Sequence, residues 1–76
     1  AFVAVTPLDF EQEASVPTKL KDIDGIEACY SITGSPSFML VVRVATPSKL
    51  EELINTIHRV VPVSTETTMV LQTYFD

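Results

Sequence analysis

The stretch IEACYSITGSPSFMLVVRVA, residues 26–45, has the composition of two β-strands joined by a tight turn. Apolar and polar side chains alternate in residues 26–33, as is typical of a strand with one buried face. Residues 34–37, GSPS, are types that favour chain reversal, and the most apolar segment, residues 38–45, follows at once. The stretch therefore predicts a β-hairpin. Large apolar groups point to both sides of its second strand, so we expect neither face there to be fully exposed to water.

A helix is predicted before the hairpin. Asp9 can cap a helix that begins near Phe10, where apolar residues recur at roughly helical spacing. Because a proline in a helix interior costs about 3 kcal/mol, Pro17 predicts a bend or two short pieces, with the second beginning near this proline. Asp24 and Gly25 supply the signal that ends the helix.

A second helix is predicted after the hairpin. Thr46 is suited to be its N-cap, Pro47 its first residue, and Pro62 ends it. The apolar residues of this segment form one stripe at helical spacing: Leu50, Leu53, Ile54, Ile57 and Val61.

Strand-like segments stand at both ends of the chain. Residues 1–6, AFVAVT, are apolar and end at Pro7, and residues 63–75 are rich in threonine, valine and aromatic side chains. The order is therefore strand, helix, strand, strand, helix, strand within one domain, residues 1–76. This order predicts an α+β, ferredoxin-like βαββαβ sandwich with an antiparallel sheet in the order 4-1-3-2 and both helices on one face.

The helix-free face of this sheet is predicted to be apolar. It would include Met39, Val41, Met69 and Leu71, or the neighbours of these residues on the opposite side of the same strands. A domain of this size buries only about 60% of the surface of its unfolded chain, so its stability alone is marginal. Broad apolar patches are uncommon on the surface of a free monomer. We therefore expect at least a dimer, formed by packing two such faces together.

Composition excludes several classes of function. The formal net charge is -5 and the five Lys and Arg residues are scattered, so no basic stripe exists to contact nucleic acid. No apolar run approaches the roughly 20 residues of a membrane span, and the N-terminus lacks the pattern of a signal peptide. With a single cysteine, no intramolecular disulfide can form, which favours the cytoplasm. The chain enters a strand at Ala1, which we interpret as a domain cut from a longer protein.

No catalytic residue, metal site or cofactor is predicted. His58 follows Ile57 of the apolar stripe, at the edge of the second helix, and is interpreted as a surface residue. Strict alternation from Ile26 places Tyr30 on the same side as Ile26 and places Cys29 on the more polar side, where we interpret it as a packed or interface thiol. The acidic residues near the start of the first helix, such as Glu11 and Glu13, are interpreted as solvated.

The turn of the hairpin is the candidate binding site. Hydroxyl groups, a glycine and backbone N–H groups at a hairpin tip could hold the carboxylate and the ammonium group of an amino acid. The same residues also suit a plain turn, because Gly, Ser and Pro gather at most hairpins. The residues alone leave both interpretations open. The candidate residues are Thr33, Gly34, Ser35, Pro36 and Ser37.

Three stretches carry a resemblance to a known family: AFVAVT at 1–6, DIDGIEACYSITGSPSFMLVV at 22–42 and STETTMVL at 64–71. They resemble the C-terminal ligand-sensing domain of the Lrp/AsnC family of feast/famine transcription regulators, also called the RAM domain. The resemblance implies a single domain for effector binding and oligomerisation, which forms dimers through its sheet and then tetramers or octamers. It also implies a small effector, commonly an amino acid, bound between dimers near the turn. DNA would be contacted only through a helix-turn-helix domain, which this chain does not contain.

Within the resemblance, Thr33 and Gly34 match the turn of the family, and the next three residues take its variable, effector-facing part. The family usually has an acidic residue where Ser37 stands. A serine offers the ammonium group of an amino acid only a neutral acceptor, and charged hydrogen bonds are about twice as strong as neutral ones. This departure allows a weaker amino-acid site, a different effector, or an assembly module without a ligand.

Two other classes share the order of elements. An ACT-like amino-acid-sensing domain usually pairs through sheet edges or helices, so a dimer with unstacked sheets would favour it. A small dimeric αβ-barrel enzyme of the cofactor-independent monooxygenase type needs an interior cavity with a positioned histidine or acid, so His58 pointing into such a cavity would favour that class. The favoured hypothesis is a regulatory, non-enzymatic effector-binding domain.

Overall fold

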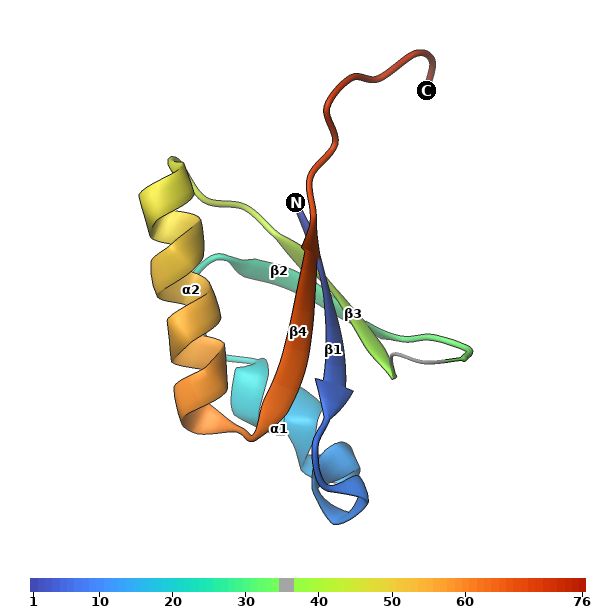
Figure 1. Ribbon diagram of the computed structural model, residues 1–76, viewed down its shortest axis with the longest axis vertical. Helices are drawn as coiled ribbons and strands as arrows, with labels where there is room; N and C mark the ends of the chain where they lie inside the picture. Colours follow the sequence, from blue (N-terminus) through green and yellow to red (C-terminus); the bar gives the residue numbers. More distant parts are fainter. Residues whose placement is uncertain (35–36) are drawn as a thin grey trace.

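The protein was analysed as a computed structural model, which describes residues 1–34 and 37–76, apart from the side chain of Phe10. The elements follow one another in the predicted order, with the first helix in two pieces (Figure 1). They are β1 (Phe2–Pro7), the 3-10 helix η1 (Phe10–Ser15), α1 (Val16–Leu20), β2 (Ile26–Ser31), β3 (Phe38–Val42), α2 (Pro47–Val60) and β4 (Val63–Thr68).

The four strands form one antiparallel sheet in the order β2-β3-β1-β4, which is the predicted order 4-1-3-2 counted from the other edge. Both helices lie on the same side of this sheet (Figure 1). The predicted ferredoxin-like fold class is confirmed. The hydrophobic core lies between the sheet and the helices, and its fully buried side chains come from every layer: Val3, Val5, Val16, Leu20, Leu40, Ile57 and Val61.

The first helical segment is divided at the predicted place. The carboxylate of Asp9 accepts a hydrogen bond from the backbone N–H of Glu11 at 3.0 Å, as expected of a cap. Pro17 lies in the first turn of α1, where its missing N–H costs no helical hydrogen bond. The helix ends at Leu20, earlier than the predicted stop at Asp24 and Gly25. Phe10 is the first residue of η1, as predicted, and its side chain lies outside the described part of the structure.

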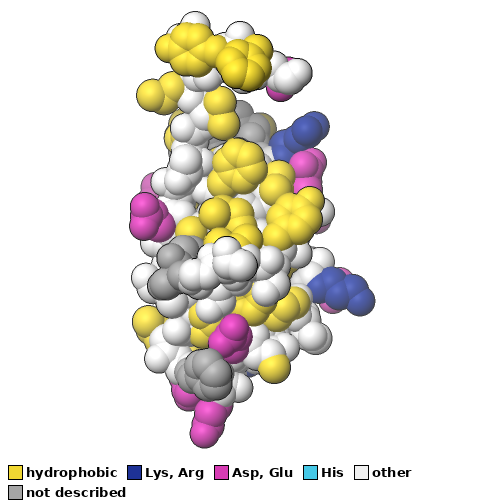
Figure 2. Space-filling model, turned by 90° about the vertical axis from the view of Figure 1, so that its right-hand side faces the viewer, with side chains coloured by type: hydrophobic (Ala, Val, Ile, Leu, Met, Phe, Trp, Pro, Cys, Tyr) yellow, Lys and Arg dark blue, Asp and Glu magenta, His cyan; other side chains and the backbone are white. Residues whose placement is uncertain are grey.

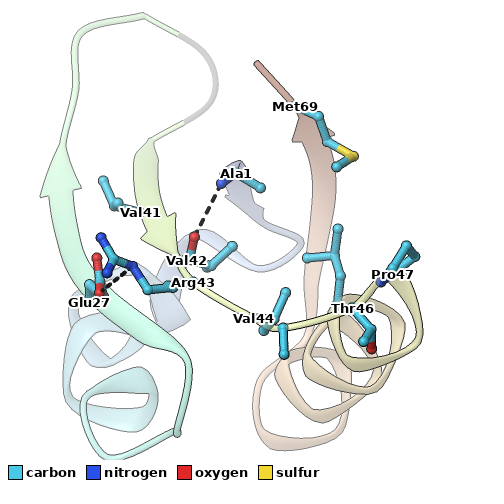
Figure 3. A pocket seen from close by; sticks show the side chains of 11 residues that line it. Ala1, Glu27, Val41, Val42, Arg43, Val44, Thr46, Pro47 and Met69 are labelled. Atoms are coloured by element: carbon cyan, nitrogen blue, oxygen red, sulfur yellow. Dashed lines mark hydrogen bonds and ion pairs between the residues drawn. The ribbon is translucent and has the colours of Figure 1, made fainter. Parts of the chain in front are cut away.

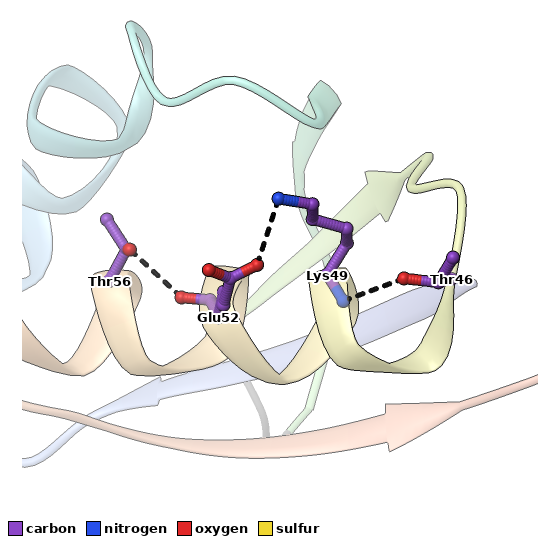
Figure 4. Close-up of polar contacts among 4 residues, drawn as sticks. All are labelled: Thr46, Lys49, Glu52 and Thr56. Atoms are coloured by element: carbon purple, nitrogen blue, oxygen red, sulfur yellow. Dashed lines mark hydrogen bonds and ion pairs between the residues drawn. The ribbon is translucent and has the colours of Figure 1, made fainter.

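The second helix begins and ends where the sequence predicts. The hydroxyl oxygen of Thr46 accepts a hydrogen bond from the N–H of Lys49 at 3.2 Å, and Pro47 is the first residue of the helix. Leu53 and Ile57 are buried against the sheet. Figure 4 shows polar contacts along this helix, where the ammonium group of Lys49 lies 3.3 Å from the Glu52 carboxylate and Thr56 donates to the Glu52 carbonyl.

An irregularity in β2 changes which side chains face the core. The register between β2 and β3 shifts between Ile26 and Ala28, as in a β-bulge. Ile26 and Cys29 therefore both pack against the core, whereas Tyr30 lies opposite Met39 on the other face. The strict alternation predicted for this strand, with Ile26 and Tyr30 on one side and Cys29 on the polar side, is wrong. Cys29 is a packed thiol as expected, and burial raises its pKa.

The last strand is shorter than predicted. Residues 63–75 were expected to form it, but β4 ends at Thr68, whose partner in β1 is Phe2, the first residue of that strand. Beyond this pair no β1 residue continues the hydrogen-bonded ladder, and residues 69–76 extend past the sheet (Figure 1). Met69 and Leu71 lie in this extension, where they are 59% and 97% exposed. The sequence had placed them on one sheet face with Met39, and that placement is wrong because the strand ends before them.

Candidate effector-binding turn

The turn between β2 and β3 is closed by a backbone hydrogen bond. The N–H of Ile32 donates to the carbonyl oxygen of Ser37 at 3.0 Å. Thr33 and Gly34 are exposed and Ser37 is half-buried. Of the five predicted site residues, Ser35 and Pro36 lie outside the described residues. The other three share one exposed hairpin end.

Gly34 has the backbone conformation that glycine favours. Its φ is +81°, a value that side chains rarely allow. Among the described residues, a Cβ atom added there would meet nothing within 4 Å. The glycine is thus favoured by its φ angle, and the described residues leave open space beside its Cα atom.

A groove opens beside the start of β3, close to the turn. Its volume is about 700 Å³. The antiparallel register places Val5 opposite Phe38, so the end of β1 and the helical segment that follows reach the end of the hairpin. The residues that line the groove are Glu11, Glu13, Ala14, Pro17 and Phe38. Sequence reasoning interpreted the two glutamates as solvated and missed the groove, because no local pattern signals a contact between segments 25 residues apart.

The sheet face away from the helices carries apolar side chains on β1, β2 and β3, whereas β4 contributes Ser64, Glu66 and Thr68 to it. We call this the open face, defined by Phe2, Ala4, Ala28, Tyr30, Met39 and Val41, which pair with one another across the strands. Phe2 is 39% exposed and Tyr30 56% exposed. Hydrophobic side chains gather over the sheet on this side of the molecule (Figure 2). The sequence left open whether Met39 and Val41 or their neighbours on the opposite side of β3 face away from the helices, and the structure places Met39 and Val41 there.

A second hollow lies at the opposite end of the hairpin from the turn. It has a volume of about 380 Å³ and lies between the end of β3, the start of α2 and Met69 (Figure 3). An ion pair at its edge joins Arg43 to Glu27 at 3.1 Å, and the side chains of this pair are 82% and 46% exposed. Exposed ion pairs of this kind contribute little to stability and leave both groups in water. The charged side chains in the lining of this hollow are those of this exposed pair.

His58 is the histidine that the monooxygenase-type alternative would require in an interior cavity. His58 is exposed, and its Nε2 lies 2.9 Å from the hydroxyl of Thr65, so the imidazole joins α2 to β4 at the surface. In the parts of the chain that the structure describes, no three His, Cys, Asp or Glu side chains are grouped to hold a metal ion. Over the same residues, no helix has the length and apolar character needed to cross a membrane.

Comparison with known proteins assigns the family. The family model described as the Lrp/AsnC ligand binding domain matches residues 1–76. The chain belongs to this family. Its sequence is 43% identical over 75 residues to the HTH-type transcriptional regulator LrpA of Mycobacterium tuberculosis, and the match covers 99% of this chain and 50% of that protein.

Solved structures agree with this assignment. The crystal structure of the M. tuberculosis leucine response regulatory protein LrpA superposes with a TM-score of 0.87 at 40% identity. A feast or famine regulatory protein from M. tuberculosis complexed with L-methionine superposes with the same TM-score at 41% identity. In both cases the match covers 99% of this chain and 51% of the other. The Lrp/AsnC chain thus spans about half the length of the relatives it matches.

The family assignment decides between the classes that the sequence left open. The protein is an Lrp/AsnC ligand-binding domain and not an enzyme. The monooxygenase-type alternative also lacks its positioned histidine, because His58 lies at the surface against Thr65. The ACT-like alternative is set aside, because the whole chain matches the Lrp/AsnC model.

Proposed function

We propose that this Lrp/AsnC domain senses an amino acid for a transcription regulator and that residues 33–37 form part of the effector site. The observation that carries the proposal is the geometry of Gly34, which has a φ of +81° and open space where a side chain would lie. Backbone N–H groups at such a turn can approach an anionic group closely. The related regulatory protein complexed with L-methionine supports an amino acid as the effector.

The open face is the proposed dimer interface. Phe2 and Tyr30 are partly exposed there, and Met39 and Val41 are only half-buried. Packing this face against the same face of a second copy would remove these apolar groups from water. The turn lies at the end of the hairpin, so it can take part in contacts between dimers, which would form tetramers or octamers.

DNA binding is proposed to belong to a helix-turn-helix domain outside this chain. The net charge of -5 disfavours direct contact between these residues and phosphates. The relative LrpA is an HTH-type regulator, and the match covers 50% of its sequence. Regulation would then take place in the cytoplasm, with effector binding changing the assembly of these domains.

Calorimetric titration with the twenty amino acids tests the effector site. Ser37→Asp adds a carboxylate beside the turn and should strengthen amino-acid binding by about 1–2 kcal/mol, since charged hydrogen bonds are stronger than neutral ones. Ser48→Asp is the control, because Ser48 is exposed on α2 and the variant has the same net charge. If no amino acid gives binding heat with the wild type or with Ser37→Asp, this result would contradict amino-acid sensing and leave assembly as the supported role.

A further inference from the structure

We infer that residues 69–75, which we call the arm, pack against the open face of a second copy of this chain. The inference rests on the dimer proposed above and adds to it a contact from outside the sheet. The arm continues beyond the sheet (Figure 1) and carries five exposed large hydrophobic side chains: Met69, Val70, Leu71, Tyr74 and Phe75. Exposed apolar groups in such number are uncommon on a free monomer and indicate a partner.

The arm gains little burial from its own chain. Continuing the register of β1 with β4 would place Ala1 opposite Met69. The backbone of Ala1 is already bonded to β3, because its nitrogen donates to the carbonyl of Val42 at 3.2 Å and its carbonyl accepts from the N–H of Val42 at 3.0 Å. In the described part of the chain, the residues that form the core or pack against it include none after Val63. A second copy can provide the surface that the arm lacks.

The open face by itself offers a small area for a dimer. A specific interface buries about 800 Å² on each partner. Phe2 and Tyr30 are the exposed large hydrophobic residues of the open face, at 39% and 56%. Because a fully buried aromatic side chain covers about 150–250 Å², these two offer on the order of 200 Å². Met39 and Val41 are half-buried and add less than two exposed side chains would.

The arm supplies much of the missing area. Leu71, Tyr74 and Phe75 are 97%, 83% and 93% exposed. The two aromatic side chains alone offer on the order of 350 Å² by the same measure. Hydrophobic side chains on this extension continue the apolar surface that lies over the sheet (Figure 2). With the arm, the apolar surface of each copy approaches the size that a stable dimer requires.

The polarity of the sheet indicates where the arm lies on the second copy. Residues 69–75 contain no charged side chain. On the helix-free side, β4 presents Glu66 between two hydroxyl residues, whereas β2 and β3 present Tyr30 and Met39. An uncharged apolar segment matches the β2 and β3 part of the open face and not the β4 part. In a two-fold dimer each copy contributes one arm and receives the other.

A single tryptophan on the arm tests its position. The chain contains no tryptophan, so the fluorescence of Phe75→Trp reports the arm alone. Its emission should shift to shorter wavelength, and its quenching by acrylamide should fall, as the protein concentration rises and the dimer forms. Asn55→Trp, at an exposed position of α2 on the helix side, is the control and should stay water-exposed at every concentration.

Two results of this measurement would overturn the inference. One is a water-exposed Phe75→Trp in samples that sedimentation shows to be dimeric. The other is a buried Phe75→Trp that does not respond to dilution into the monomer, because the arm would then pack within its own chain.

A charge on the arm tests its contribution to assembly. Leu71→Asp should raise the dissociation constant of the dimer about tenfold or more in sedimentation, because the burial of a leucine side chain is lost. Its thermal unfolding at low protein concentration should match that of the wild type, since Leu71 is exposed. Asn55→Asp adds the same charge on α2 and should leave the dissociation constant unchanged.

The outcomes separate this inference from the proposed dimer. Dimers of wild-type strength in both Leu71→Asp and Phe75→Asp would overturn the role of the arm and leave the open-face dimer intact. A wild-type protein that stays monomeric at every concentration would overturn both.

Discussion

The two faces of β3 differ in burial more than in composition. Phe38, Leu40 and Val42 face the helices and are 7%, 0% and 3% exposed. Met39 and Val41 alternate with them and remain half-buried on the open face. All five side chains are apolar, so hydrophobicity alone does not tell which side forms the core. The difference arises because α1 and α2 cover one side of the sheet and leave the other side open.

The largest expected effect contrasts two neighbouring residues of β3. Leu40→Ala should lower the free energy of unfolding by about 2–5 kcal/mol, because it leaves a cavity in the core. Met39→Ala is the matched change on the open face and should cost a dilute monomer less than about 1 kcal/mol, because partly exposed sites lose few contacts. Urea denaturation at low protein concentration measures both. Equal losses of unfolding free energy in the two variants would mean that the open face is packed within the monomer.

A charge on the open face should act on assembly rather than on folding. Val41→Asp would place an unpaired carboxylate in the proposed dimer interface and should weaken association by about 3 kcal/mol. Thr18→Asp, an exposed position on the helix side, adds the same charge as a control. Sedimentation at micromolar concentration follows the shift toward the monomer. A wild-type protein that sediments only as an 8.4 kDa monomer would contradict the dimer itself.

Two glycines extend the comparison to the ends of the hairpin. Gly25 and Gly34 both have positive φ, at 97° and 81°. A Cβ atom at Gly25 would lie 3.3 Å from Leu53 and 3.4 Å from Val44, whereas one at Gly34 would meet no described residue within 4 Å.

Gly34→Ala should therefore cost only the backbone strain, about 1–2 kcal/mol, and Gly25→Ala should cost more, because its surroundings must also shift. Thermal unfolding of the two variants measures which of them loses more stability. Gly34→Ala should also impair effector response or assembly beyond the dimer, as seen by calorimetry and sedimentation, while the dimer remains folded. Effector binding unchanged in Gly34→Ala would place the site elsewhere.

The elements whose signals are local were predicted well. Thr46 and Pro47 start α2 as expected, and Pro17 divides the first helix. The cap, the proline and the apolar stripe all act within one or two turns of helix, so they can be identified from neighbouring residues. The order of elements then restricts the sheet to few topologies.

The errors concern features that depend on pairing partners. The bulge near Ile26 and the end of β4 at Thr68 are set by the strands beside them. Residues 69–75 have the composition of a strand, yet β1 supplies no residue to pair with them. Strand composition reports what a segment can do, and the neighbouring backbone determines where the ladder stops.

The candidate site also has one part with a local sequence signal and one part that depends on distant partners. The turn at residues 33–37 could be predicted because turn residues act locally, and its role in effector binding stays a prediction. The groove could not be predicted from the sequence. Glu11 and Phe38 line it together only because of the register of β1 with β3.

The sequence by itself determined the order of the elements, the covering helix α2, the hairpin and the position of its turn. These follow from side-chain periodicity and backbone preference, which need no distant partner. Only the tertiary structure decided which face of β3 is buried, where β4 ends and which charges lie beside the turn. Each of these depends on contacts between segments far apart in the chain, and one residue of register moves a side chain from one face of the sheet to the other.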